Sequence, residues 1–314
     1  MKVLFCTSPQ PDYLASCLWD GLQEVLGAEN VRDAGHTPDF HSHQMETPNQ
    51  RLCSSRVGYH ATSVEQDVDL MVLNACFTNT FDWHWAWKMQ NRLKPGGKIA
   101  YVEGWDRADQ IQDPNQMSNP PFLVDAVFRR EIDPNVAYPY RPYHLDFAAP
   151  ARWFLTTKQL GMKRDIDVYF AGHCPTHAVR VAMMKEVASL AFRRDLTFVL
   201  GNGHPFIPEQ HFNLLRRSRI ALCPVGVENS STLRTYEALA CGAVPLFIGS
   251  PLRVRSGPDY EDGTYGACQH ASELLPLIDT LLHLPEVRPC AEGLHTTAAR
   301  ARRLLDITMK QVSL

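Results

Sequence analysis

The chain has 314 residues, of which 45% are hydrophobic and 21% charged, and its formal net charge is −3 at pH 7. This length accommodates two domains or one large domain, and the charge argues against a dedicated nucleic-acid-binding protein. No apolar run approaches the ~20 residues of a membrane span. The nine cysteines are scattered, and no signal-peptide pattern opens the chain, so we expect buried reduced thiols and a cytoplasmic protein.

The first half of the chain alternates apolar strands with amphipathic helices. Val3–Cys6 has the composition of a buried strand, and the apolar spacing over Leu14–Leu26 predicts a helix that ends at Gly27. Two more strands and a helix are expected before residue 150: Asp67–Phe77, Lys98–Glu103 and, for the helix, Asp82–Leu93. This alternation indicates a parallel sheet with helices on both faces.

A second alternating series begins at Asp165, after a segment rich in proline and aromatic residues. Its expected strands are Ile166–Phe170, Leu196–Leu200, Ile220–Pro224 and Val244–Ile248, and its expected helices are His177–Phe192, Pro208–Arg217, Leu233–Ala240, Glu273–Leu284 and Thr296–Leu305. We therefore expect an α/β fold of two Rossmann-like domains, residues 1–150 and 151–314, with a cleft between them. Ligands of such sheets bind at the carboxyl ends of the strands.

The most informative stretch covers residues 222–250, which read as strand, polar loop, helix and strand. Ser230–Thr232 place hydroxyls and backbone N–H groups at the start of the helix, where anions bind. Ser230, Arg234 and Glu237 share one helix face. In a binding site, Arg234 would contact phosphate oxygens and Glu237 would accept hydrogen bonds from a vicinal diol such as ribose. A capped helix with an Arg234–Glu237 surface pair is the alternative that spacing leaves open.

Two strand ends before this stretch add further candidates. Gly172 and His173 follow one expected strand, Arg180 lies in the first turns of the next helix, and Asn202 follows the next strand. Here Arg180 would neutralise phosphate and the small residue would let the backbone approach it, whereas an ordinary turn with an exposed arginine is the alternative. The spacing His173-Cys174-x-x-His177 is zinc-like, but it lacks a distant second pair of ligands, so we expect no metal.

A longer motif carries a resemblance to a known superfamily. Cys223-Pro224-x-Gly226, followed by Ser231-x-x-Arg234-x-Tyr236-Glu237-Ala238-Leu239-Ala240-Cys241-Gly242-Ala243-Val244-Pro245, resembles the C-terminal signature of GT-B glycosyltransferases. It is most similar to the group 1, spore-maturation-type and exostosin-like branches. Asp167–Gly172 also resembles the strand that opens their second domain. The resemblance covers roughly residues 120–305 and is specific to the superfamily, not to a substrate.

The resemblance implies an enzyme that moves a hexose or pentose from a nucleoside-diphosphate sugar to an acceptor. The nucleotide sugar is then a co-substrate, and neither a cofactor nor a metal is expected. Glu237 would bind the ribose hydroxyls, the amides of Ser230–Thr232 would hold the diphosphate, and Glu228 and Asn229 would lie by the donor sugar. The group 1 pattern has glutamate where this chain has Asn229. This departure leaves open whether the transfer retains the configuration at the anomeric carbon of the sugar. The exostosin-like branch, which inverts that configuration, matches the loop better.

Inversion requires a general base from the first domain. Asp12, Glu103 and Asp106 lie at expected carboxyl ends of strands; we favour Asp106 and then Asp12, although both also suit caps or turns. A nucleotide-sugar epimerase or hydrolase and a non-catalytic nucleotide-sugar binding protein remain alternatives. The acceptor is open between a small molecule, a glycan and modified DNA, the last with little support from the net charge. The sequence does not indicate the oligomeric state.

Overall fold

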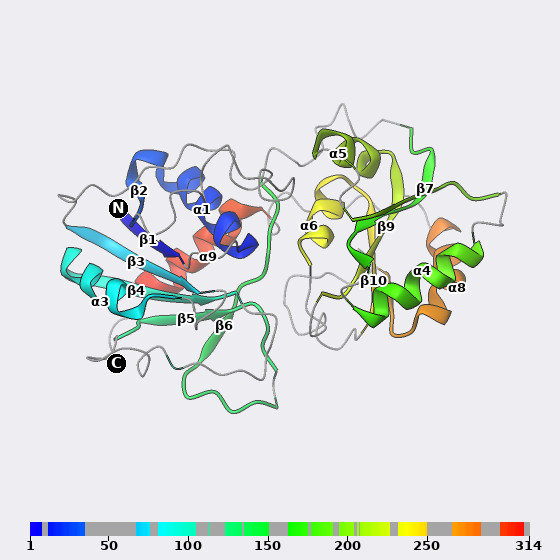
Figure 1. The fold of residues 1–314 in the computed structure, drawn as a ribbon. Coiled ribbons are helices and arrows are strands. Elements are labelled where there is room, and N and C mark those ends of the chain that lie inside the picture. The colour runs from blue at the N-terminus through cyan, green and yellow to red at the C-terminus, as the bar shows by residue number, and fades with distance from the viewer. Residues whose placement is uncertain are drawn as a thin grey trace. The chain divides into compact units, whose positions relative to one another are not determined.

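The computed structural model describes residues 1–7, 12–34, 67–75, 81–104, 113, 123–133, 135–150, 163–174, 177–190, 195–203, 206, 208–226, 232–249, 266–283 and 296–310. Contacts divide the chain into two compact units, Met1–Pro150 with Thr296–Leu314, and Ala151–His295. Each unit contains a parallel sheet and alternating helices (Figure 1). The expected α/β class with two Rossmann-like units is thereby confirmed, whereas the cleft between them stays a prediction.

The first unit is built on a six-stranded sheet in the order β2-β1-β3-β4-β5-β6. Its strands are β1 (Val3–Thr7), β2 (Val31–Asp33), β3 (Val68–Ala75), β4 (Leu93–Glu103), β5 (Ala126–Arg129) and β6 (Pro142–His144), and its helices are α1 (Tyr13–Leu26), α3 (Trp83–Met89) and α9 (Thr297–Lys310). On one face Phe5 meets Trp19 of α1 edge to face, with ring centroids 5.7 Å apart. On the other face Tyr101 packs against Trp83 of α3. Alternate strand residues therefore supply two separate cores.

Some elements of the first unit differ from the sequence expectation. The helix expected over Asp82–Leu93 ends as α3 at Met89, and a 3-10 turn leads into β4 at Leu93. Asp82 caps it, because its Oδ1 accepts a hydrogen bond of 2.8 Å from Trp85 N. The short strands β2, β5 and β6 were not expected, since three or four residues carry little periodicity.

The second unit holds a five-stranded sheet in the order β11-β10-β9-β7-β8. Its elements are β7 (Ile166–Gly172), α4 (Ala178–Leu190), β8 (Phe198–Asn202), α5 (Pro208–Arg216), β9 (Ser218–Pro224), α6 (Leu233–Ala240), β10 (Val244–Ile248), β11 (Gly266–Cys268) and α8 (Leu274–His283). Val168 and Phe170 of β7 pack with α4 and α8. Tyr169, with the opposite side-chain direction, faces α5 and α6.

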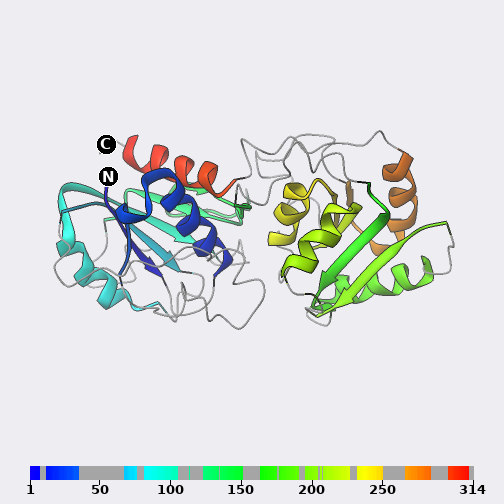
Figure 2. The same ribbon diagram turned by 90° about the horizontal axis from the view of Figure 1, so that it is seen from above.

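The last helix belongs to the first unit, which differs from the expected grouping of residues 151–314. Thr297 N donates to Ala149 O at 3.0 Å, and Thr297 Oγ1 donates to Asp20 Oδ2 of α1, also at 3.0 Å. Gly21 lies so close to Thr297 O that an added Cβ would collide with it. Figure 2 shows α9 beside α1. The chain therefore returns to its first sheet after completing the second, which strand and helix order alone does not reveal.

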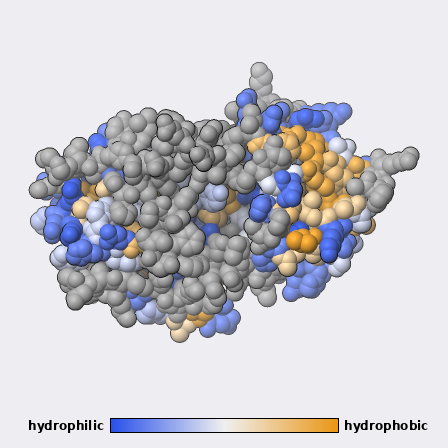
Figure 3. Space-filling model, in the orientation of Figure 1, coloured by the Kyte–Doolittle hydropathy of each residue, from blue (hydrophilic) through white to orange (hydrophobic). Residues whose placement is uncertain are grey.

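Two further properties of the described residues concern the surface and the thiols. On the face drawn in Figure 3, hydrophobic residues gather over part of the second unit beside hydrophilic ones. Within those residues no helix is long and apolar enough to cross a membrane. The cysteines that the structure describes, at positions 6, 17, 174, 223, 241 and 268, are buried and free of disulfides.

The Gly21 contact yields a stability test of the α1–α9 packing. Gly21→Ala should lower the free energy of unfolding by about 1–3 kcal/mol, because the methyl group forces α9 off α1. In an open helix position the same change would stabilise by about 1 kcal/mol. Urea denaturation measures the difference, with Glu24→Ala, an exposed position of the same helix, as the control. A more stable Gly21→Ala variant would contradict the packing described.

Candidate functional site

The order of strands in the second sheet creates a switch point between β7 and β9. β8 pairs with one side of β7, whereas β9, the next strand in the chain, pairs with the other side. Connections that leave β7 and β9 at their carboxyl ends therefore diverge. Ligands of open α/β sheets bind at such points.

Two arginines meet the backbone at this switch point. Arg234 comes from α6, which follows β9, but its Nε donates to Ala171 O of β7 at 2.9 Å. Arg180 comes from α4, which follows β7, but its Nε donates to Val225 O after β9 at 3.2 Å. Arg234 is thus held by β7, although its helix follows β9. Arg180 is held by the chain after β9, although its helix follows β7.

The two arginines also affect each other electrostatically. The pKa of Arg180 is lowered to about 10, first by burial and then by the positive charge of Arg234. Arg180 still carries its charge near neutral pH. Its Nη1 donates to His173 O at 3.0 Å, and Arg234 lies over the ring of Phe170. Like charges held together at the carboxyl edge of a sheet favour binding of an anion.

The residues at the ends of β7 and β8 shape this edge. A Cβ on Gly172 would collide with Nη2 of Arg234, so glycine leaves the space that the guanidinium occupies. Asn202 Oδ1 accepts a hydrogen bond of 3.2 Å from Cys174 N and thereby holds the turn after β7. The structure brings Gly172, His173, Arg180 and Arg234 together, as a shared site requires.

Helix α6 has the expected bounds, and its ends explain why. Thr232 is the N-cap in extended conformation, but its side chain makes no cap hydrogen bond, contrary to the expected hydroxyl cap. Its Oγ1 is buried without a hydrogen-bond partner in the part of the chain that is described. At the other end, Gly242 has φ +73°, and Ala243 N donates to Ala238 O at 2.9 Å. This is the left-handed closure that glycine favours.

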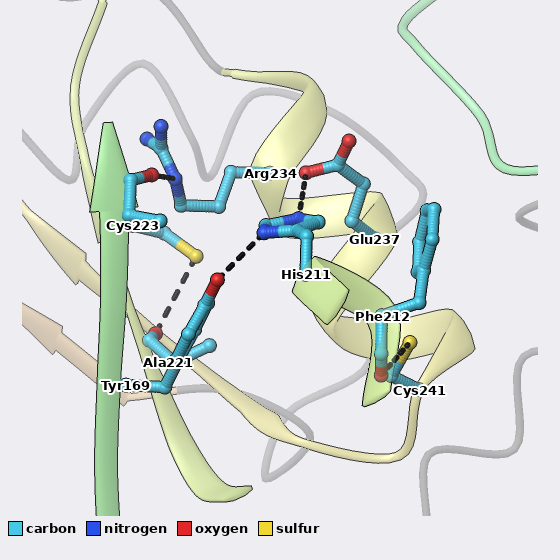
Figure 4. A network of polar contacts seen from close by, with 9 residues as sticks. Tyr169, His211, Phe212, Ala221, Cys223, Arg234, Glu237 and Cys241 are labelled. Carbon is cyan, nitrogen blue, oxygen red and sulfur yellow. Dashed lines mark hydrogen bonds and ion pairs between the residues drawn. The ribbon is translucent and has the colours of Figure 1, made fainter. Parts of the chain in front are cut away.

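Glu237 lies one turn after Arg234 and contacts residues that the sequence analysis did not identify. His211 of α5 lies between Glu237 and Tyr169 of β7 (Figure 4). Tyr169 Oη and His211 Nδ1 are 2.6 Å apart, and His211 Nε2 and Glu237 Oε2 are 3.3 Å apart. The side chains of His211 and Glu237 are 12% and 7% exposed. No spacing pattern links the three, since they come from three different elements.

The first sheet has its own switch point, between β1 and β3, because β2 and β3 pair with opposite sides of β1. Asp12 lies there as the N-cap of α1, where its Oδ1 accepts a hydrogen bond of 2.8 Å from Leu14 N. Burial raises the pKa of the Asp12 carboxyl, against the lowering effects of Leu14 N and Arg130. A Cβ on Gly104 would lie 2.6 Å from Asp12 Oδ2, so glycine after β4 leaves that oxygen its space.

Glu103, at the end of β4, is paired inside the first unit. Its Oε2 lies 2.8 Å from Arg129 Nη1, and both side chains are 1% exposed. Burial raises the pKa of Glu103 to about 7, although Arg129 opposes the rise. A carboxylate enclosed in this way suits a structural role better than contact with substrate.

The remaining predicted site residues lie outside the described residues: Asp106, Glu228, Asn229, Ser230 and Ser231. The described part of the chain contains no group of three or more His, Cys, Asp or Glu side chains that could hold a metal ion. Asn202, His173 and Thr232 line the edge just described, but their contact with a ligand stays a prediction.

The raised pKa of Glu103 predicts a specific pH dependence. The folded state holds the Glu103 proton more tightly than the unfolded state, so this contribution to stability is present below pH 4.5 and lost as pH rises through about 7. Glu103→Gln cannot show this loss. Urea denaturation of both proteins should show the variant gaining about 3 kcal/mol on wild type between pH 4.5 and pH 8. If the free energies of unfolding of the two proteins changed with pH in parallel, the raised pKa of Glu103 would be contradicted.

Comparisons with known proteins bear on the fold. No protein family and no curated protein matches the sequence. The chain is similar to the solved structure of AviGT4, a glycosyltransferase involved in avilamycin A biosynthesis, with a TM-score of 0.56 and 13% identity over 98% of this chain and 96% of that one. This likeness shows a shared two-unit α/β fold.

Two further solved structures have lower scores. T4 phage β-glucosyltransferase is 14% identical over 100% of both chains, with a TM-score of 0.47. HepE of Anabaena, in complex with UDP and glucose, is 10% identical over 98% of this chain and 95% of that one, with a TM-score of 0.49. Neither adds to what AviGT4 shows about the fold.

Proposed function

We propose that the chain is a glycosyltransferase that moves a sugar from a nucleoside-diphosphate sugar to an acceptor. The observation that carries the proposal is the pair of arginines at the switch point of the second sheet, with a buried glutamate one turn along α6. Guanidinium groups suit a diphosphate, and a carboxylate suits a vicinal diol. The signature over residues 223–245 and the fold shared with a glycosyltransferase, AviGT4, support transfer as the reaction.

The donor would bind along the carboxyl edge of the second sheet. Arg180 and Arg234 would contact the diphosphate, and Glu237 would accept hydrogen bonds from the ribose hydroxyls. Polar backbone and side-chain groups near the diphosphate would complete its contacts. They belong to Gly172, His173, Asn202, Ser230, Ser231 and Thr232. Glu228 and Asn229 would lie toward the sugar. The two guanidinium groups supply the positive charge that a diphosphate needs, so we propose binding that does not depend on a metal.

The transfer step would use a base from the first unit. The acceptor oxygen forms a bond to the anomeric carbon while the bond from that carbon to the diphosphate oxygen breaks. The bonding electrons leave with the nucleoside diphosphate, and the acceptor proton passes to a carboxylate. Asp12 is the candidate that the structure describes, and Asp106 is the other. A pKa raised by burial strengthens Asp12 as a base.

The finer assignments follow the sequence. Asn229, where group 1 enzymes have glutamate, favours the inverting exostosin-like branch over the group 1 branch. We propose a hexose or pentose donor and a small-molecule or glycan acceptor. The buried, unpaired thiols of the described cysteines suit a reducing, cytoplasmic environment. Product analysis without acceptor separates transfer from epimerisation, because an epimerase needs no acceptor.

Donor binding is tested by variants of α6. A thermal-shift screen of ADP, CDP, GDP, TDP and UDP first selects the nucleotide that raises the melting temperature most. Calorimetry should then show that Arg234→Ala and Glu237→Ala each weaken its binding about 10- to 100-fold, since each removes a charged hydrogen bond of about 1.5–3 kcal/mol.

Arg217→Ala is the matched control for these variants. Arg217 precedes β9 and pairs with the exposed Asp165 before β7, at the opposite edge of the sheet. Its loss should leave nucleotide affinity unchanged. If wild type, Arg234→Ala and Glu237→Ala bound the nucleotide with equal affinity, the proposal that α6 forms the donor site would be contradicted.

The role of Asp12 is tested by Asp12→Asn. Asparagine also caps helices, so α1 should persist. We expect the rate at which nucleoside diphosphate is formed from the nucleotide sugar to fall about 10²- to 10⁴-fold. The rate is measured with water alone and with a panel of acceptors. Nucleotide affinity by calorimetry should not change. A variant with wild-type turnover would exclude Asp12 as the base and leave Asp106.

A further inference from the structure

We infer that His211 and Tyr169 are positioning residues that fix the carboxylate of Glu237 for binding the ribose of the donor. The inference rests on the proposed function, because it takes Glu237 as the group that receives the ribose hydroxyls. It adds two residues, from α5 and β7, that lie outside the sequence signature.

The placement of the two residues follows from the fold. Tyr169 stands on the face of β7 that α5 and α6 cover, opposite to Val168 and Phe170, which pack into the core under α4 and α8. His211 lies in the middle of α5, whose neighbour is α6. Three elements distant in sequence therefore bring Tyr169, His211 and Glu237 into one line (Figure 4).

The chemistry of the groups gives the line a direction. An ionised carboxylate only accepts hydrogen bonds, so His211 Nε2 carries the proton in its contact with Glu237 Oε2. A neutral imidazole then has an accepting Nδ1, which faces Tyr169 Oη at 2.6 Å. With His211 in this neutral tautomer, the tyrosine hydroxyl donates to His211 and His211 donates to Glu237. Burial and the charge of Glu237 raise the pKa of Tyr169, so that hydroxyl keeps its proton.

This arrangement restricts rotation of the Glu237 carboxylate, whose orientation affects binding of the ribose hydroxyls. With one oxygen held by a ring that is itself held by Tyr169, rotation of the Glu237 carboxylate breaks a hydrogen bond. The site is largely closed to water, with 12% and 7% of the two side chains exposed, so solvent competes weakly for these contacts. A diol needs acceptors in a set direction, and a carboxylate fixed before binding loses less freedom when the diol arrives.

A packing role for His211 would also explain part of the geometry. Its ring lies 5.6 Å from that of Tyr169 and 5.4 Å from that of Phe212, between centroids. Removing a packing contact would weaken α5 as a whole and affect every nucleotide alike. A positioning role instead predicts an effect confined to the ribose hydroxyls, and this difference is the basis of the test.

The test compares a ribonucleoside diphosphate with its 2′-deoxy counterpart by calorimetry, using the base selected by the thermal-shift screen. Wild type should prefer the ribonucleotide by about 10-fold or more, as one charged hydrogen bond provides. His211→Leu should reduce this preference to less than about threefold while hardly changing the affinity for the deoxynucleotide. Tyr169→Phe should reduce it part of the way. His211→Gln, whose amide still donates to Glu237, should restore much of it.

Phe212→Leu is the matched control, since it removes a ring that packs against His211 but leaves the hydrogen-bonding groups of Tyr169, His211 and Glu237 in place. Its preference for ribose should equal that of wild type. An unchanged preference in His211→Leu, or an equal loss for both nucleotides, would overturn the inference. If His211→Leu does not fold, Tyr169→Phe decides the question, because an unchanged preference for ribose in that variant would also overturn the inference.

The outcomes also separate this inference from the proposed function. Wild type that binds none of the nucleoside diphosphates refutes the proposed function, and the inference falls with it. Wild type that binds them without preferring ribose refutes the inference alone. Glu237 would then hold no ribose hydroxyl, while Arg180 and Arg234 could still hold the diphosphate.

Discussion

The site depends on the exchange of two arginines across the switch point of the second sheet. Arg234 follows β9 but is held by β7, and Arg180 follows β7 but is held by the chain after β9. The exchange exists only because β8 and β9 lie on opposite sides of β7. With β9 beside β8, the two guanidinium groups would not converge. The strand order thus determines where the two positive charges meet. The pKa of Arg180 is lowered to about 10, first by burial and then by the charge of Arg234, and an anion would relieve that repulsion.

The two units differ in the chemistry at their carboxyl edges. The second sheet ends in arginines and a helix start, which suit negative charge. The first sheet ends in Asp12, a carboxyl whose burial raises its pKa. In the transfer that we propose, the edge of the second sheet would receive the leaving diphosphate and the edge of the first sheet would receive the acceptor proton. The proposed roles require no residue shared between the two sheets, because each edge is formed by the strands of its own sheet.

Much of the fold was predictable because its strongest signals are local. Leu233–Ala240 was placed correctly, since Gly242 supplies the left-handed turn that ends the helix. The location of α9 was not, because it depends on Thr297 meeting Asp20 and Gly21 across the length of the chain. His211 escaped notice for a similar reason: its partners lie on β7 and α6, at no fixed spacing. The charged residues of the candidate site could be named from their type and position, whereas His211 and Tyr169, which we propose to orient Glu237, could be identified only in the structure.

The central claim concerns where the nucleotide binds, and a crystal structure with the best nucleoside diphosphate of the thermal-shift screen tests it most directly. The account predicts the diphosphate within hydrogen-bond distance of Arg180 and Arg234, with the ribose hydroxyls on Glu237. A nucleotide bound instead at the edge of the first sheet, beside Asp12, with the two arginines unliganded, would contradict it.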